Sequence, residues 1–386
     1  MAVLGVPTLL EMTVAEPSTA NNRLLQIARA RRAVMQEGGS MTDMLVHGWY
    51  EGAWIERSWR RCLEAGQRPQ DPVGFDLLPA QAFRRVEEAN HQLVTAARPV
   101  LEQLGRAIAS TRYFAILTNQ DGVVVDAHGP IDRSDPRAAL ITRIGVDLSE
   151  RSVGTTAIGA ALAEHQPVWL HRGEHFYEQT SCYSCAGAPL FGPDGACVGM
   201  LDLTGIDAAE RPELKHLVVQ SARSIENALT LARPHSLVLR LNWPGRLLGD
   251  DDDGIVCLDD EGWVTGSNAA ARQMMSGLAG PGPGPVHCSE LFAQPWEPLY
   301  DLARCVEQAP MELPLWSGLR LQALPQLAGD GAAAATARVP LREVEIAMIR
   351  KAVSEARGNV MEAARALGIS RATVYRKLSQ KAPKTP

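Results

Sequence analysis

Three segments of the chain share one pattern, and this pattern constrains the fold more than any other feature. Residues 113–129, 188–205 and 254–268 each begin with an apolar run, pass through a turn rich in Asp that ends in Gly, and continue with a second apolar run. Because Asp and Gly tolerate the backbone dihedral angles of tight turns, each segment is predicted to form a β-hairpin. Helix-like stretches separate the hairpins, so the sequence predicts an α+β multidomain protein built on antiparallel sheets.

Two longer stretches between the hairpins have the composition of helices. Residues 79–109 carry strong helix formers with apolar side chains at helical spacing, and Pro99 is expected to kink this helix or to divide it in two. Residues 212–232 form an amphipathic pattern after the second hairpin. Ser267 and Asn268 are candidates for capping a short helix after the third hairpin, because their side-chain oxygens can accept a first-turn N–H.

The bulk composition argues against several classes of protein. The chain has 386 residues, of which 46% are hydrophobic, and this is enough for ordinary globular cores. No apolar run approaches the roughly 18 residues of a membrane span, and the apolar N-terminus lacks the basic flank of a secretory signal. Seven cysteines at scattered spacings do not make a disulfide framework and fit a reducing compartment. We therefore expect a cytoplasmic protein that does not bind a membrane.

The C-terminal tail differs from the rest of the chain in charge. Residues 341–386 hold ten Lys or Arg and four Asp or Glu, a balance of +6, whereas the whole chain has a net charge of −6, so the rest carries −12. A basic end on an acidic body predicts binding to a polyanion. Residues 327–340 precede this tail, are rich in Ala and Gly, and are predicted to be a linker.

The tail has the pattern of a helix-turn-helix. A helix is predicted over residues 341–357, and the next helix ends at Gly368, which permits a sharp turn. In the last helix Val374 and Leu378 are four residues apart, so both are expected to face inward. The residues expected to lie on the DNA-binding side are Ser370, Arg371, Thr373, Tyr375, Arg376 and Lys377.

These residue types suit contact with a duplex. Ser370 can cap the last helix, and Arg371 sits at the end of that helix, where a recognition helix first meets base edges. An Arg can donate two hydrogen bonds to guanine, whereas Thr373, Arg376 and Lys377 suit phosphates. The sequence therefore predicts double-stranded DNA as a partner.

The segment GNVMEAARALGISRATVYRKL, residues 358–378, closely resembles the Fis-type helix-turn-helix that ends many bacterial enhancer-binding regulators. The resemblance implies a homodimer whose two recognition helices bind a roughly palindromic site. Tyr375 stands where the nucleoid protein Fis has an Arg that contacts bases, which implies a different base preference.

The resemblance extends upstream. Residues 150–176 and 181–205 resemble the GAF-type sensor of acetoin-catabolism and dihydroxyacetone-operon regulators, and the third hairpin resembles a PAS-like module. Such sensors imply an apolar pocket for a small-molecule ligand, lined from the hairpins 113–129 and 188–205. The predicted fold is a GAF-like and a PAS-like antiparallel sheet with flanking helices, followed by an all-α DNA-binding domain. The predicted divisions are an N-terminal extension (1–54), GAF-type sensor (55–235), PAS-like domain (249–326), linker (327–340) and Fis-type helix-turn-helix (341–382).

One departure from that family affects the expected function. Full-length members have an AAA+ ATPase between sensor and DNA-binding domain, but this chain has no G-x-x-x-x-G-K-[ST] motif, and Gly-Lys never occurs. We therefore expect no ATP as a cofactor and no ATPase activity. The protein would repress, activate by recruitment, or pair with a full-length enhancer-binding regulator at shared sites.

Four residues within a short stretch are candidates for the sensor: His171, His175, Cys182 and Cys185. Structural packing, a thiol redox pair at the C-x-x-C, and metal ligation all remain open for them, and no metal site is assigned. His171 to His175 also matches H-x-x-E-H, a zinc-peptidase motif, but the surrounding pattern predicts the end of a strand and a loop rather than a helix.

The preferred function is a cytoplasmic, homodimeric transcriptional regulator, not an enzyme, that senses a small molecule or a redox or metal signal. The alternative is a signalling adaptor that dimerises through its tail and binds a partner protein. A zinc peptidase at His171 and His175 is the remote alternative.

Overall fold

The computed structural model describes residues 19–35, 53–278, 284–305 and 309–328, and in the tail residues 360, 361, 364, 371 and 374. The chain divides into two compact units, Met1–Pro325 and Gln326–Pro386. The elements are α1 (Thr19–Met35), α2 (Ala53–Glu64), α3 (Ala80–Ala89), α4 (His91–Ala107), β1 (Tyr113–Asn119), β2 (Val124–His128), α5 (Pro136–Ile141), α6 (Glu150–Val153), α7 (Ala157–Glu164), β3 (Val168–His171), the 3₁₀ turns η4 (Arg172–Glu174) and η5 (Glu178–Thr180), β4 (Tyr183–Phe191), β5 (Cys197–Ile206), α8 (Leu214–Leu231), β6 (Leu237–Asn242), β7 (Gly254–Leu258), β8 (Val264–Ser267), α9 (Ala269–Met274), the 3₁₀ turn η6 (Ser276–Leu278), α10 (Cys288–Leu291), α11 (Glu297–Ala303), β9 (Met311–Pro314) and β10 (Arg320–Leu327).

All three predicted hairpins are confirmed. They are the antiparallel pairs β1–β2, β4–β5 and β7–β8. Each turn contains a glycine with φ between +81° and +89°, a conformation that a residue with a Cβ adopts only under strain. An Asn or Asp side chain opens each turn by accepting the N–H two residues ahead, as Asp259 does from Glu261 at 3.0 Å.

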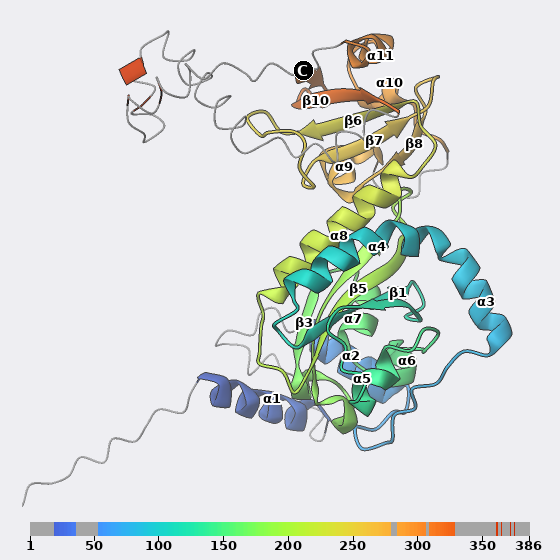
Figure 1. The fold of residues 1–386 in the computed structure, drawn as a ribbon, viewed down its shortest axis with the longest axis vertical. Helices are drawn as coiled ribbons and strands as arrows, with labels where there is room; N and C mark the ends of the chain where they lie inside the picture. Colours follow the sequence, from blue (N-terminus) through green and yellow to red (C-terminus); the bar gives the residue numbers. More distant parts are fainter. Residues whose placement is uncertain are drawn as a thin grey trace, which may run out of the picture. The chain divides into compact units, whose positions relative to one another are not determined.

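The first sheet has the strand order β2-β1-β5-β4-β3 and is covered on both faces (Figure 1). Helices α4 and α8 pack against each other and against one face, and α7 packs on the other. Alternation along the central strand β5 separates the two cores: Leu201 and Leu203 belong to the α4/α8 side, whereas Met200 and Ile206 belong to the opposite core. A sheet with both faces buried is expected to carry apolar side chains on both sides.

The second sheet has the order β8-β7-β6-β10-β9. Its hairpin β7–β8 was predicted, but strand β6 and the hairpin β9–β10 were not, although Gly318, with φ +85°, lies in the turn that joins β9 to β10. The predicted cap of α9 is confirmed at Asn268, whose side chain accepts the N–H of Ala271 at 2.9 Å. The fold class is therefore the predicted one: two sensor-type sheets with flanking helices, ahead of a tail whose described residues are helical.

The predicted long helix over 79–109 is divided, but not at the proline. The break lies at Asn90, between α3 and α4, and Pro99 lies inside α4. The backbone N–H and the side-chain amide of Asn90 both donate to the carbonyl of Val86, at 3.0 and 2.7 Å. This local hydrogen bond competes with continuation of the helix. Helix α4 continues through Pro99 while burying an apolar stripe that includes Leu101.

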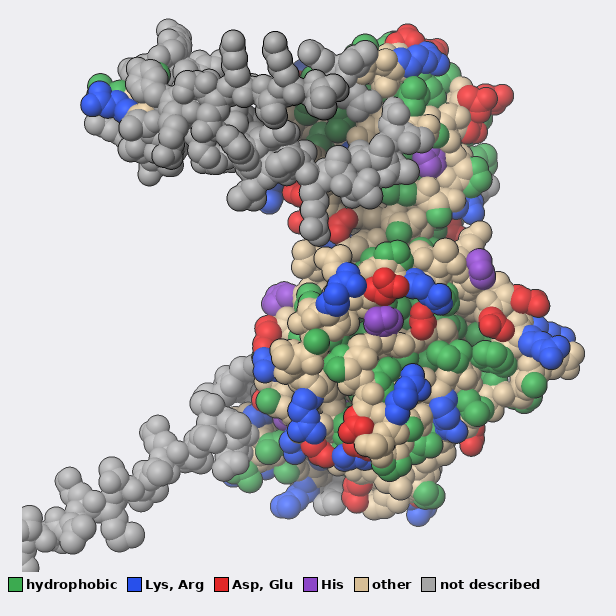
Figure 2. All heavy atoms as spheres, in the orientation of Figure 1, with side chains coloured by type: hydrophobic (Ala, Val, Ile, Leu, Met, Phe, Trp, Pro, Cys, Tyr) green, Lys and Arg blue, Asp and Glu red, His purple; other side chains and the backbone are tan. Residues whose placement is uncertain are grey.

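Helix α1 was not foreseen, because its residues are weakly patterned. It adds Ala30 and Val34 to the core on the α7 side of the first sheet. Within the described part of the chain, every helix is too short or too polar to span a membrane. On the face drawn in Figure 2, Lys and Arg side chains are interspersed with Asp and Glu, so neither sign of charge dominates the described part of that face.

Candidate functional site

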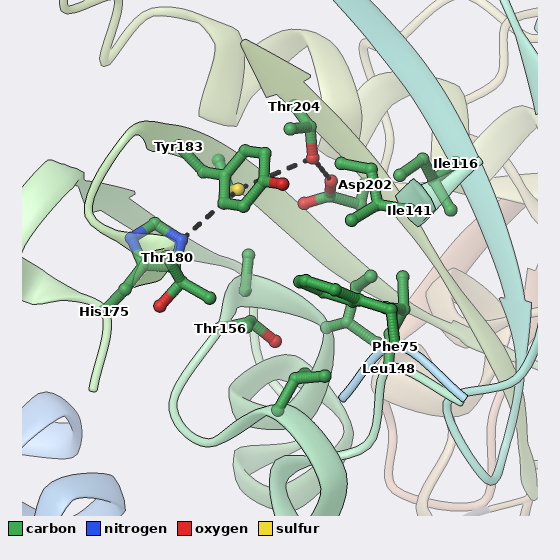
Figure 3. Close-up of a pocket in the computed structure, with 14 residues that line it drawn as sticks. Phe75, Ile116, Ile141, Leu148, Thr156, His175, Thr180, Tyr183, Asp202 and Thr204 are labelled. Carbon is green, nitrogen blue, oxygen red and sulfur yellow. Dashed lines mark hydrogen bonds between the residues drawn. The ribbon is translucent and has the colours of Figure 1, made fainter. Parts of the chain in front are cut away.

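A small cavity lies against the first sheet, on the face that α7 covers (Figure 3). It encloses about 30 Å³ and is walled mainly by apolar side chains from β1, α5, α7 and the loops beside them. The predicted hairpins contribute only Ile116, Asp202 and Thr204 to it, so the expected pocket is present but most of its wall comes from elsewhere. The lining residues are Phe75, Ile116, Ile141, Leu148, Val153, Thr156, Ala157, Ile158, His175, Thr180, Tyr183, Cys185, Asp202 and Thr204.

Asp202 is the most unusual residue of this cavity. It sits in the middle of the central strand β5, opposite Ile116 of β1 and Gly187 of β4, and is completely buried. Its Oδ2 accepts a hydrogen bond from the Thr204 hydroxyl, and its Oδ1 has no partner among the described residues. Burial raises the pKa of Asp202 to about 7, against the opposing effect of the Thr204 hydrogen bond.

A chain of polar side chains leads from Asp202 to His175. The Sγ of Cys185 lies 3.5 Å from the Thr204 hydroxyl and 3.5 Å from Nε2 of His175. Nδ1 of His175 is 2.9 Å from the carbonyl of Arg172, so this nitrogen carries the proton and Nε2 accepts. Burial lowers the pKa of His175 to about 4, so its ring is neutral at pH 7.

The four predicted sensor residues do not form one cluster. Ser184 and Cys185 are neighbours in β4 and point to opposite faces of the sheet. His171 bonds to Ser184 on one face at 2.9 Å, whereas His175 contacts Cys185 on the other. Among the described residues no three His, Cys, Asp or Glu side chains gather closely enough to hold a metal ion. The tetrahedral arrangement considered from the sequence is therefore not what the fold builds.

The thiols do not match the redox alternative either. Burial raises the pKa of Cys182 and, more strongly, that of Cys185, whereas a reactive C-x-x-C thiol needs a lowered value. Both cysteines are unpaired. Cys182 is half-buried ahead of β4, where its Sγ lies 3.7 Å from the carbonyl of Gln179.

The H-x-x-E-H segment is the end of strand β3 followed by a 3₁₀ turn, as the flanking pattern predicted. Glu174 is buried, accepts the backbone N–H of His171, and pairs with Arg23 of α1 at 3.0 Å. Burial raises the pKa of Glu174 to about 7 despite the nearby Arg23. This glutamate is therefore a structural contact of the loop, and the helix that a zinc peptidase requires is not formed here.

Helix α1 holds the loop that carries His175. The guanidinium of Arg31 donates to the carbonyls of Gly173, His175 and Phe176, and lies over the ring of Trp59 at 5.6 Å. Three carbonyls on one planar cation restrict how far this loop can move. The wall of the cavity at His175 therefore depends on a helix more than a hundred residues earlier in the chain.

The sequence analysis missed Asp202 and Thr204 as site residues. A signal was present: both stand in the run MLDLTG, at alternate positions of a strand whose intervening residues are leucines. A polar pair in a strand with two buried faces departs from the pattern of such strands.

In the tail, the described residues are helical. Ala364 and Val374 are buried, and Arg371 is exposed. Complete burial of Val374 agrees with the expectation that it faces inward. Ser370, Thr373, Tyr375, Arg376, Lys377 and Leu378 lie outside the described residues, so their roles stay predictions.

Two family models match the chain. Residues 29–227 match the model described as "MimR, N-terminal domain", and residues 340–380 match "Bacterial regulatory protein, Fis family". The first match covers about half of the chain, including the first sheet and its cavity.

Two individual proteins that resemble this chain are also regulators by name. The acetoin catabolism regulatory protein of Cupriavidus necator is 30% identical over 282 residues, covering 70% of this chain and 41% of its own length. The propane 2-monooxygenase operon transcriptional activator MimR of Mycolicibacterium goodii is 28% identical over 207 residues, covering 52% of this chain and 33% of its own length. The chain thus spans less than half the length of these two relatives, which are named as a regulatory protein and a transcriptional activator.

A solved structure is also similar. The Escherichia coli DhaR(N)–DhaL complex superposes with a TM-score of 0.43 at 15% identity, over 71% of this chain and 99% of that chain.

Proposed function

Because the chain belongs to the family defined by the MimR N-terminal domain, we propose that it is a DNA-binding transcriptional regulator that responds to a small molecule. The observation that carries the proposal is the match of residues 340–380 to the Fis family of bacterial regulatory proteins. The basic excess of the same tail supports it, because Lys and Arg neutralise DNA phosphates.

The DNA contacts are assigned to the last helix. Arg371, which is exposed, contacts base edges, while Thr373, Arg376 and Lys377 contact phosphates. Ser370 caps the helix, and Tyr375 alters the base preference relative to an Arg at that position. A homodimer presents two such helices to one site, and its half-sites are separated by about one helical turn of DNA.

The effector binds in the cavity of the first sheet, next to Asp202. The sensor and the tail act in the cytosol, where the DNA target is. The chain has no Gly-Lys pair from which to build a phosphate-binding loop, so the protein acts without hydrolysing ATP. It represses, recruits polymerase directly, or shares its sites with a full-length enhancer-binding regulator.

Footprinting tests the proposal. The purified full chain should protect a discrete, roughly palindromic site near its own gene, with an affinity that falls as salt rises. Arg371→Ala should weaken binding about tenfold to a hundredfold, as expected for loss of a two-bond contact to a base. Arg304→Ala is the matched control, because Arg304 is exposed and pairs with Asp301 far from the tail in sequence. A protein that protects no discrete site would instead be a signalling adaptor.

A further inference from the structure

The turn between β4 and β5, residues 192–196, reaches from the first sheet to the second. The backbone N–H of Ser267, in the edge strand β8, donates to the carbonyl of Pro193 in this turn at 2.9 Å. Gly266, the residue before Ser267, lies so close that a Cβ on it would come within 3.0 Å of the Cβ of Pro193. The β4–β5 turn therefore packs directly against the backbone of an edge strand, which otherwise presents unpaired polar groups.

Two ionisable side chains hold the β4–β5 turn from neighbouring helices. Glu226 of α8 accepts the backbone N–H of Phe191, the last residue of β4, at 2.8 Å. Nη1 of Arg272, in α9, donates to the carbonyl of Gly192 at 3.3 Å and also to the carbonyl of Ser267. A single guanidinium nitrogen thus bridges a carbonyl of the first sheet's turn and a carbonyl of the second sheet's edge strand.

Both side chains hold these positions against a cost of burial. Burial lowers the pKa of Arg272 and raises the pKa of Glu226 to about 7. Taking such groups out of water is unfavourable unless hydrogen bonds compensate. The bonds to the turn supply that compensation, so the turn and the two side chains stabilise one another.

A second attachment joins α8 to the second sheet. The buried amide of Asn268 donates to Oδ1 of Asn227 in α8 at 2.7 Å and to the carbonyl of Asp253 at 2.8 Å. Its Oδ1 accepts the N–H groups of Ile255 in β7 and of Ala271 in α9, both at 2.9 Å. The side chain thereby uses two donor and two acceptor positions, and it fixes α8 to β7 and α9 together.

We propose that the β4–β5 turn is a rigid joint between the two sheets, so that β4 and β5 cannot shift without moving β8 and α9. Two attachments, one at the turn and one at Asn268, remove the freedom of rotation that a single attachment would leave. Cys185 and Asp202 lie in the two strands that this turn connects, so a displacement of either strand is transmitted to the second sheet. The joint is a property of the body of the protein and goes beyond the proposed function, because it does not require the tail to bind DNA.

Native-state hydrogen exchange of the full chain tests the joint. Exchange at increasing urea concentrations, followed by mass spectrometry, gives the free energy of opening for each strand. In the wild type, the slowest amides of β5 and β7 should exchange with the same free energy and the same dependence on urea, because the two sheets open together.

The decisive variant changes a residue whose hydrogen bond to the turn lies within the first sheet's own part of the chain. Glu226→Met removes the acceptor of the Phe191 N–H, and the peptides of β7 and β8 should then exchange at least about tenfold faster than those of β5 do. Glu226→Gln is the matched control, because its amide oxygen still accepts that N–H, and it should behave like the wild type.

A second pair of variants approaches the joint from α9. Arg272→Met keeps an unbranched side chain but loses both bonds to carbonyls, so it should accelerate exchange in residues 188–197 of the first sheet at least about tenfold. Gln273→Met is its control, because Gln273 is the exposed neighbour of Arg272 in the same helix, and it should leave that exchange within about twofold of the wild type.

Circular dichroism establishes that each variant folds. If Glu226→Met does not fold, Gly266→Val replaces it, because its side chain pushes Pro193 away from β8 without altering Glu226 or Arg272. Different opening free energies of β5 and β7 in the wild type would overturn the inference. So would equal exchange of β7 and β8 in Glu226→Met and Glu226→Gln, or unchanged exchange of residues 188–197 in Arg272→Met.

Discussion

The two sheets each bury an aspartate, and the two aspartates differ in how completely the protein satisfies them. Asp253, beside β7 of the second sheet, accepts from Asn242 at 3.1 Å and from the backbone N–H of Gly249 at 2.6 Å, with Arg240 at 3.8 Å. Asp202, in β5 of the first sheet, has one hydroxyl partner, and its Oδ1 has none among the described residues.

This difference teaches that burial of a charged residue does not by itself mark a binding site. A carboxyl whose lone pairs are all used by the protein holds a loop in place, and replacing it breaks several contacts at once. A carboxyl with an open oxygen beside a cavity does less for the fold and is available to a ligand. Three measurements test whether the two aspartates differ in this way.

The largest expected effect is on the second sheet. Asp253→Leu leaves Asn242 and the N–H of Gly249 without their acceptor, so it should lower the free energy of unfolding by about 3 kcal/mol. Urea denaturation followed by circular dichroism measures the change. Asp252→Ala is the control, since Asp252 is exposed and only pairs with the exposed Arg223, and it should change little. An Asp253→Leu variant as stable as the wild type would show that the two aspartates are equivalent.

The pH dependence of stability isolates the titration of Asp202. Because burial raises its pKa to about 7 in the folded state, the folded protein binds a proton that the unfolded chain has lost between about pH 4 and 7. Its contribution to stability is therefore present at low pH and is lost as pH rises through 7. Between pH 5.5 and 7.5 the wild type should lose on the order of 2 kcal/mol more than Asp202→Asn.

Denaturation midpoints of both proteins across that range provide the measurement. Subtracting the Asp202→Asn profile from the wild-type profile removes the contribution of other buried titrating groups, such as Glu174, because both proteins contain them. Parallel pH profiles for the two proteins would mean that Asp202 keeps one protonation state throughout.

A smaller effect of opposite sign is expected when Asp202 is made apolar. Asp202→Leu removes an incompletely satisfied carboxyl from a buried face, so it should raise the free energy of unfolding by about 1 kcal/mol. A gain in stability is expected of an incompletely satisfied carboxyl, whereas a loss of stability would make Asp202 resemble Asp253.

The smallest effect concerns the C-x-x-C. Cys182 is only half-buried, and its Sγ lies 3.7 Å from the carbonyl of Gln179, so Cys182→Ser should leave the free energy of unfolding within about 0.5 kcal/mol of the wild type. Calorimetry under reducing and oxidising conditions makes the measurement. A strong dependence on oxidation that Cys182→Ser removes would restore the redox alternative.

Local features of this protein followed from its sequence. Gly122, Gly195 and Gly262 end turns that only a few backbone conformations can make, so the three hairpins could be located from the sequence pattern alone. Asn268 could be identified as a cap because its short amide side chain reaches the first turn of the helix that follows. The buried Val374 fits the spacing from which the last helix was predicted.

The site depended on contacts between residues that are distant in sequence. Because β3 pairs with β4, His171 lies opposite Ser184 and contacts its hydroxyl. His175, four residues later, contacts Cys185 on the other face of the sheet. The predicted helix over 79–109 ends at Asn90, because the Asn90 side chain donates a hydrogen bond to the carbonyl of Val86. Pro99 was expected to interrupt the helix, but α4 continues through it because the apolar stripe around Pro99 is buried.

Turn chemistry and helix periodicity act over a few residues, so the sequence by itself determined the hairpins, the cap and the pattern of the tail. One oxygen of Asp202 remains open, and the groups packed around the carboxyl decide which one. They are Thr204 in the same strand, Cys185 in the neighbouring strand β4, His175 in the loop after η4, and cavity walls that come from several helices and loops. Only the tertiary structure decided that, because whether a buried polar atom is satisfied depends on every group packed around it, wherever that group lies along the chain.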